Sequence, residues 1–430
     1  MLMPRDFPQT LTRPTTGEEL ERLKKYTFRI KNLRYRAGAN ISFQTFLNLT
    51  SLNPSYEWVS LWPKLKTLCW ATLAEEQLQF MRYFLTCGVQ KLAINLMNVK
   101  VWESRKALSL VEARCGQLTE FNLYAPAEAN DVESQTIIRE TILHNYHTLK
   151  FFCPPQGSSS AVIEAVLGLP ALETLEMHNP KIGWPRVSHT SLRSLERLIF
   201  TLDKPNHIPR LLGDVRGSKL RTFGLTSPYP VREDHLKSLA DLFKLTGLYD
   251  SLNRFSWQPP RGNEQSLTWE FVTILTPFVN LHTLSLGVNC DGTCRFRFKH
   301  EHIITLSEQM PQLRDLNVGG EPCAHGGSAT DIGFHTFAEL ARRCLDLSRL
   351  SIHFNPHCID LGNYTGPNRN VVHWDVGNTV LPEDPEMLTM IALRAQMLFP
   401  EATIAGETRT DALGWRAVRE KFKQPLDLNV

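Results

Sequence analysis

A short leucine-rich pattern recurs along this chain and restricts its possible folds more than any other feature does. The fullest copy, LHTLSLGVN at residues 281–289, has the form LxxLxLxxN. Eleven further copies are readable, and their first residues are Ile30, Leu65, Val89, Leu118, Leu149, Leu172, Leu195, Leu220, Leu252, Leu313 and Leu347. A weaker match begins at Phe399. Self-similarity of this extent indicates one structural unit repeated along the chain.

Each copy alternates apolar and polar positions as a short strand does. The fourth and sixth positions point to one face, and the third, fifth and seventh point to the other, because side chains alternate along a strand. Successive copies begin 23 to 35 residues apart, which leaves room for the connection of about a dozen residues that parallel strands need. The sequence therefore predicts an α/β leucine-rich-repeat solenoid, with a curved parallel sheet inside and helices outside.

Segments between the predicted strands carry apolar residues at the helical period. Helical connections are predicted at residues 75–86, 132–147, 158–167, 232–246, 301–310 and 331–344, and end-covering helices at 15–26, 384–398 and 411–422. The expected domains are an N-terminal segment with a capping helix (1–29), the solenoid (30–405), and a C-terminal capping helix with a tail (406–430). Residues 287–297, 319–330 and 355–377 lack a period and are expected to be rim loops beside the concave face.

Composition argues against several kinds of partner. The formal net charge is only +3, without the basic footprint of a nucleic-acid-binding domain. Nine scattered cysteines, an odd number, predict reduced thiols in the cytoplasm or nucleus. No stretch reaches the roughly eighteen apolar residues of a membrane-spanning helix. We therefore expect a protein partner on the concave face and the C-terminal rim loops, rather than nucleic acid or membrane.

Outward-facing strand positions are the usual binding surface of a repeat array. Basic residues occupy such positions in the C-terminal half, namely Arg197, Arg254 and Arg349 at the third, Arg221 and Arg314 at the second, and His353 at the seventh. Tyr364 and Trp374, in the last long loop, are of the types that anchor interfaces. These residues are candidate contacts for acidic groups, since arginine's planar fork suits carboxylates. The alternative is that they are ordinary surface residues, or aromatic residues packing a loop.

Cysteine and histidine suggest a second candidate site. Cys290, Cys323 and Cys358 follow the first positions of three consecutive repeats by nine, ten and eleven residues, so they are expected at one edge of neighbouring strands. Together with Cys294 and His325 they could hold zinc, which thiolates and imidazoles bind. The alternative is that cysteine fills the Asn/Cys position usual in this repeat. No cofactor is expected.

Short catalytic motifs are missing from the sequence. It contains no GxSxG elbow, no GxxxxGK[ST] phosphate loop and no HExxH. His300, Glu301 and His302 do not have the spacing of a zinc-protease helix, and the HGG at 325–327 has no nucleophile motif beside it. An enzyme is therefore the least favoured interpretation.

Five blocks of the sequence, at residues 19–33, 61–70, 376–378, 398–400 and 415–418, carry a family resemblance. They resemble the repeat region of fungal F-box proteins with irregular leucine-rich repeats. The resemblance implies an intracellular protein whose repeats hold the substrate of an SCF-type ubiquitin ligase. It concerns the repeat region alone, because the residues before the first predicted helix contain no F-box, so binding of the SCF adaptor is not implied. The alternative is an interaction scaffold unrelated to ubiquitination.

Overall fold

The structure is a computed structural model of the whole chain. It describes residues 16–35, 62–71, 78–97, 99–125, 132–145, 147–178, 193–201, 219–226, 233–258, 273–286, 298–318, 331–362, 364–376, 379, 381–405 and 412–423. The chain divides into two compact units, which we call the N-terminal unit (Met1–Leu195) and the C-terminal unit (Glu196–Val430).

The described part of the N-terminal unit contains six parallel strands in chain order. They are β1 (Asn32–Tyr35), β2 (Thr67–Ala71), β3 (Lys91–Asn95), β4 (Glu120–Tyr124), β5 (Phe151–Cys153) and β6 (Thr174–His178). Each strand pairs with the next strand in the sequence. Equivalent repeat positions lie side by side, since Leu68 pairs with Leu92 and Leu92 pairs with Phe121.

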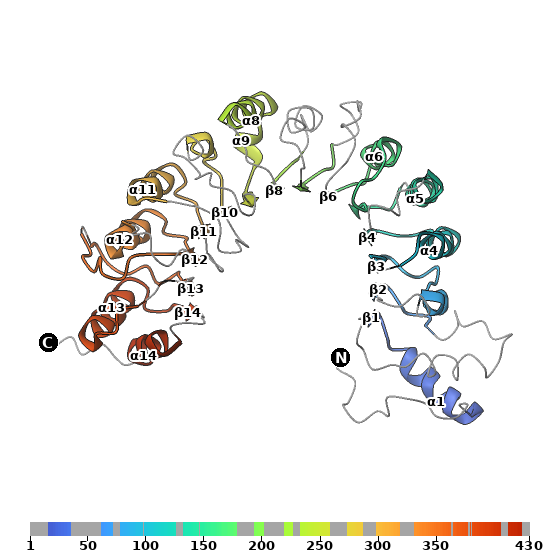
Figure 1. Cartoon of the computed structure of the whole chain (residues 1–430), viewed down its shortest axis with the longest axis horizontal. Coiled ribbons are helices and arrows are strands. Elements are labelled where there is room, and N and C mark those ends of the chain that lie inside the picture. The colour runs from blue at the N-terminus through green and yellow to red at the C-terminus, as the bar shows by residue number, and fades with distance from the viewer. Residues whose placement is uncertain are drawn as a thin grey trace. The chain divides into compact units, whose positions relative to one another are not determined.

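Helices lie on one side of the sheet of the N-terminal unit (Figure 1), and those that follow β1 connect its strands. They are α1 (Gly17–Thr27), the 3-10 helix η2 (Gln79–Tyr83), α4 (Val101–Arg114), α5 (Val132–His144) and α6 (Ser160–Leu167). Helix α1 begins at a capping box. The Thr16 hydroxyl accepts a hydrogen bond from the Glu19 N–H at 3.3 Å, and the Glu19 carboxylate accepts one from the Thr16 N–H at 2.8 Å.

The described part of the C-terminal unit contains eight parallel strands, again in chain order. They are β7 (Arg197–Thr201), β8 (Thr222–Thr226), β9 (Arg254–Gln258), β10 (Thr283–Leu286), β11 (Asp315–Val318), β12 (Arg349–Ile352), β13 (His373–Asp375) and β14 (Thr403–Ala405). Each pairs with the following strand without a shift between equivalent repeat positions.

Helices cover one side of this second sheet as well (Figure 1). They are α8 (Glu233–Thr246), α9 (Leu248–Ser251), α11 (His300–Gln309), α12 (Phe334–Arg343), α13 (Pro385–Leu398) and α14 (Ala412–Phe422). Gly247 separates α8 from α9 with a φ of 71°, a conformation that glycine adopts without strain. The Trp415 indole N–H of α14 donates to the Thr379 carbonyl at 2.9 Å, which fixes the last helix to the preceding repeat.

The hydrophobic core of each unit lies between its strands and its helices. In strands β2, β3 and β6 the fourth and sixth repeat positions are buried while their neighbours are partly exposed, as the alternation of a strand requires. Aromatic rings continue the contact from one repeat to the next, with the Phe121 and Phe152 centroids 5.6 Å apart and those of Phe223 and Phe255 6.0 Å apart. Each such side chain stabilises the fold by about 1.5–3 kcal/mol through burial.

The structure confirms the α/β leucine-rich-repeat solenoid. All twelve repeat copies contribute a strand, and the weaker match at Phe399 contributes β14. Three elements were missed, namely α4, the short helix α9 and the strand β13, which lies inside the stretch 355–377 that was expected to be a loop. The expected rim loops 287–297 and 319–330 lie outside the described residues. Of the helices within the described ranges, none combines the length and apolar character needed to cross a bilayer.

Candidate partner-binding surface

The outward-facing third repeat positions of the C-terminal unit form one row across its strands. Strand register places side by side, in this order, Arg197, Thr222, Arg254, Thr283, Asp315, Arg349, His373 and Thr403. We call these residues the third-position row. Arg197, Arg254 and Arg349 are exposed, because the buried fourth position that follows each of them points toward the helices. Three predicted arginines therefore share one face.

Asp315 interrupts the positive charge of this row. Its Oδ2 forms an ion pair with Arg349 Nη2 at 2.5 Å, with 19% of the Asp315 side chain and 57% of the Arg349 side chain exposed. Burial raises the pKa of Asp315, and the positive charges of Arg349 and Arg254 oppose that rise. The row thus contains a half-buried carboxylate beside an arginine that still presents most of its surface to solvent.

The two second-position arginines lie one residue before the row. Arg221 is exposed, and its backbone N–H donates to the Glu196 carbonyl at 2.8 Å. Arg314 lies with its guanidinium 3.8 Å from the Asp346 carboxylate, and both side chains are 59% exposed. Within the described residues, neither Arg221 nor Arg254 forms an ion pair, so these two arginines have the greatest capacity for an acidic partner.

Apart from Ile199, small or polar residues occupy the fifth positions next to the row. The aligned residues are Ile199, Gly224, Ser256, Ser285, Asn317, Ser351, Asp375 and Ala405. A Cβ at position 224 would lie 2.9 Å from Ser256 Oγ, so glycine leaves room there for the serine side chain. Ser351 Oγ donates to the Asp375 carboxylate at 3.2 Å. We call these residues the fifth-position strip, and its mostly small or polar side chains beside longer arginine side chains suit an extended segment.

His353 and Tyr364 are both held by the C-terminal unit itself. The His353 Nδ1 lies 3.5 Å from the Thr379 hydroxyl, and His353 is half-buried. The Tyr364 hydroxyl donates to the Met397 carbonyl at 2.9 Å, which attaches its segment to α13. Tyr364 therefore performs the packing role that was the alternative for it, while the residue as a whole remains partly exposed.

Trp374 lies in a different place from the one expected. It belongs to strand β13, and its side chain is fully buried. Its ring centroid lies 5.2 Å from that of Phe337, 5.7 Å from that of Phe354 and 5.5 Å from that of Phe399. The prediction of an exposed loop residue was wrong, because position 374 is the inward fourth position of a repeat. Trp374 is removed from the candidate surface.

The candidate zinc ligands fall largely outside the described residues. Cys290, Cys294, Cys323 and His325 all do so. Cys358 is described and half-buried, and its Cβ occupies the space that a Cβ at position 333 would need, so it packs against the glycine that precedes α12. Within the described residues, no three His, Cys, Asp or Glu side chains are grouped to hold a metal ion. The zinc site stays a prediction.

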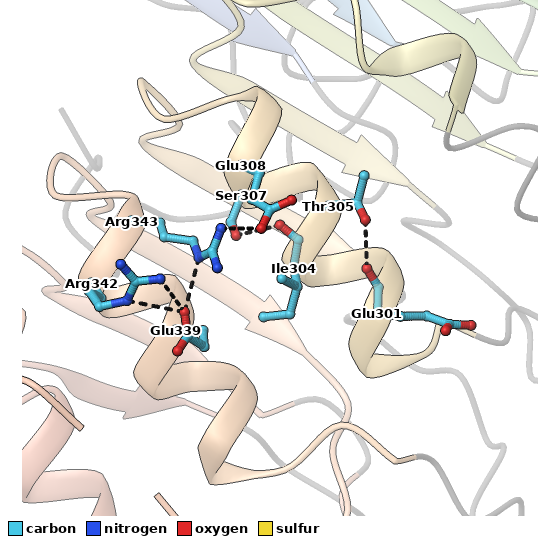
Figure 2. Close-up of polar contacts among 8 residues, drawn as sticks. All are labelled: Glu301, Ile304, Thr305, Ser307, Glu308, Glu339, Arg342 and Arg343. Carbon is cyan, nitrogen blue, oxygen red and sulfur yellow. Dashed lines mark hydrogen bonds and ion pairs between the residues drawn. The ribbon is translucent and has the colours of Figure 1, made fainter. Parts of the chain in front are cut away.

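Two arginines on the helix side of the C-terminal unit pair with carboxylates of the chain itself. Figure 2 shows Glu339 of α12 accepting from Arg342 Nη2 at 2.6 Å and from Arg343 Nε at 3.0 Å, while Arg343 also pairs with Glu308 of α11. Burial alone would raise the pKa of Glu339, but hydrogen bonds from the two arginines hold it below its ordinary value. These charges join two helices, so they are structural and offer little to a partner.

Two charged residues of the third-position row were missed by sequence reasoning. Asp315 and His373 occupy third positions in β11 and β13. The repeat that contains Asp315 was recognised in the sequence. A search of the third repeat positions for acidic as well as basic residues would therefore have found Asp315. His373 could not have been found in this way, since its strand was not recognised.

Comparison with solved structures finds chains of low similarity to this one. A chain of the yeast complex of Rad7 and Elc1 is 12% identical, with a TM-score of 0.39 over 79% of this chain and 89% of that chain. The leucine-rich repeat-containing protein LegL7 from Legionella pneumophila is 10% identical, with a TM-score of 0.38 over 87% of this chain and 97% of that chain. No protein-family model and no curated protein matches the chain. At these values the likeness carries no argument about function.

Proposed function

We propose that this chain is a non-catalytic scaffold that binds a protein partner through the strand face of its C-terminal unit. The observation that carries the proposal is the set of exposed arginines, Arg197, Arg254 and Arg349, aligned on the face opposite the helices. Arg221 and Arg314, each one residue before the third-position row, are exposed as well. Guanidinium groups bind carboxylates in a planar two-point geometry, so the partner presents acidic groups.

Within this function, the resemblance to fungal F-box leucine-rich-repeat proteins supports a role in substrate recognition for an SCF-type ubiquitin ligase in the cytoplasm or nucleus. The alternative is an interaction scaffold outside ubiquitination. Co-purification with the ligase adaptor separates the two: stoichiometric adaptor supports the ligase role, and a chain that retains its partner while excluding the adaptor supports the alternative.

Charge reversal tests the binding surface. The Arg254→Glu and Arg349→Glu double variant is expected to weaken partner binding by about tenfold or more, because two favourable charge contacts become repulsive and a tenfold change needs only about 1.4 kcal/mol. Quantitative pull-down from cell extract followed by mass spectrometry measures the loss, and circular dichroism confirms that the variant is folded.

The matched control is the Lys237→Glu and Arg416→Glu double variant. Both residues are exposed, on helices α8 and α14, and the change in net charge is the same. Control binding should equal that of the unchanged chain. Equal binding by the two double variants would show that net charge or another surface, and not the arginines of the strand face, determines recognition.

A further inference from the structure

The sign of the charge alternates along the middle of the third-position row. Strand register gives the order Arg254, Thr283, Asp315, Arg349 and His373 on strands β9 to β13. Among these aligned residues Asp315 alone is acidic, and it lies between two arginines. An acidic partner that simply covered this row would place its own negative charge against Asp315.

Asp315 is fixed in position while its neighbours remain accessible. Its carboxylate is held by Arg349 at 2.5 Å and only 19% of its side chain is exposed, so it cannot move aside without breaking that ion pair. Arg349 keeps 57% of its side chain exposed and Arg254 is exposed too. Arg349 can therefore bind a second acidic group beside Asp315, and Arg254 can bind one of its own, whereas the position between them favours a hydrogen-bond donor or a cation.

We propose that Asp315 determines the specificity of this surface, selecting an extended partner segment with a basic residue between two acidic ones. The inference rests on the proposed function and adds a charge pattern to it. One acidic residue contacts Arg254, the basic residue contacts Asp315, and the second acidic residue contacts Arg349.

The dimensions of the sheet fit a short peptide crossing the strands. Arg254 and Arg349 lie three strands apart, which is about 14 Å at the usual strand spacing of about 4.8 Å. Residues i and i+4 of an extended chain lie about 13 Å apart and point to the same face. A segment with acidic residues at i and i+4 and lysine at i+2 matches this spacing, and the long side chains absorb the remaining offset over Asp315.

The fifth-position strip allows such a segment to approach. Ser256 and Ser285 align with each other beside Arg254 and Thr283, and neither has a bulky side chain. Hydroxyl groups at these positions can donate to or accept from a peptide backbone. The fifth-position strip therefore adds hydrogen bonds that do not depend on the sequence of the partner. The charges of the third-position row select the charged residues of the partner.

The test uses three synthetic peptides with the whole chain at low ionic strength, measured by fluorescence anisotropy. Their cores are the alternating Glu-Ser-Lys-Ser-Glu, the permuted Lys-Ser-Glu-Ser-Glu of identical composition, and the all-acidic Glu-Ser-Glu-Ser-Glu. The unchanged chain is expected to bind the alternating peptide about two- to fivefold more tightly than the permuted one, the range that a partly exposed ion pair contributes.

The Asp315→Asn variant should change the affinities for the all-acidic and the alternating peptides in opposite directions. Affinity for the all-acidic peptide is expected to rise about two- to fivefold and affinity for the alternating peptide to fall by a similar factor. Glu420→Gln, which removes an exposed carboxylate of α14, is the matched control and should change neither affinity. A general electrostatic effect would move both peptides in the same direction.

The outcomes separate this inference from the function on which it rests. One outcome is that the alternating and permuted peptides bind the unchanged chain equally well and that Arg254→Glu abolishes the binding of both. This outcome would overturn the role of Asp315 and leave the acidic-partner function standing. Failure of all three peptides to bind would overturn both. Because the comparison of peptides uses the unchanged chain, it decides the matter even where the Asp315→Asn variant does not fold.

Discussion

At the residue scale, two buried asparagines, Asn145 and Asn368, make specific hydrogen bonds to the backbone. Asn145 Oδ1 accepts from the Leu118 N–H at 2.7 Å, and its Nδ2 donates to the Thr141 carbonyl at 2.9 Å. Asn368 likewise donates to the Cys344 carbonyl at 3.0 Å. Each of these side chains satisfies backbone groups where a helix gives way to a strand, because an unpaired buried group would cost about 1–3 kcal/mol.

His302 gives a pH-dependent prediction at the same scale. Burial lowers its pKa, and its Nδ1 accepts from the Lys299 N–H at 3.3 Å, which requires the neutral ring. A histidine with a lower pKa in the folded chain is protonated more readily in the unfolded chain. Its stabilising contribution is therefore complete above pH of about 6.5 and is lost as the pH falls through that value toward the folded pKa.

The expected result is a lower midpoint of thermal unfolding at pH 5.5 than at pH 7.5. The His302→Gln variant should show a smaller difference between the two pH values, because it cannot titrate. His335, whose pKa burial also lowers, contributes to what remains. An unchanged pH dependence in the variant would contradict the assignment to His302.

At the scale of elements, neighbouring helices are joined by charge as well as by packing. Arg343 of α12 contacts Glu339 of its own helix and Glu308 of α11 (Figure 2). Glu339 is only 15% exposed, whereas Glu308 is 45% exposed. Solvent screens the second pair more strongly, so the two carboxylates should differ in their contribution to stability.

The Glu339→Gln variant is accordingly expected to lower the free energy of unfolding by about 1–3 kcal/mol, the loss of charge-assisted hydrogen bonds from two arginines. Glu308→Gln should cost about 1 kcal/mol or less. Urea denaturation of both variants measures the difference. The opposite ranking would show that the contact between helices, rather than the bonds within α12, holds this region together.

At the scale of the whole molecule, each strand of a unit pairs only with its sequence neighbours within the described residues. Stability in such an array is approximately a sum of terms for each repeat and for its interfaces. Damage in one repeat should therefore spread to adjacent repeats and decline with distance, instead of unfolding a unit all at once.

Leu316→Ala in β11 tests this expectation, since Leu316 is fully buried. The cavity should cost about 2–5 kcal/mol, and hydrogen exchange should accelerate most in β10, β11 and β12, with β7 and β8 least affected. Leu198→Ala in β7, another fully buried leucine, is the control and should produce the reverse distribution. Uniform loss of protection across β7 to β14 would show that the C-terminal unit unfolds as a single cooperative block.

The sequence by itself determined the repeat and its face assignments. Leucine at the first, fourth and sixth positions specifies a strand with one buried face, because the alternation of side chains is local and the hydrophobic effect depends on side-chain type. The same alternation is sufficient to assign Arg197, Arg254 and Arg349 to the outward face.

Only the tertiary structure decided which side chains meet. Asp315 and Arg349 are paired because strand register places consecutive repeats side by side, and no local pattern reports the geometry of that pair. Strand β13 was not predicted because tryptophan replaces leucine at its fourth position. Trp374 is suited to that position only because the rings of Phe337, Phe354 and Phe399 surround it. Contacts between distant residues depend on how repeats stack, which local propensity does not encode.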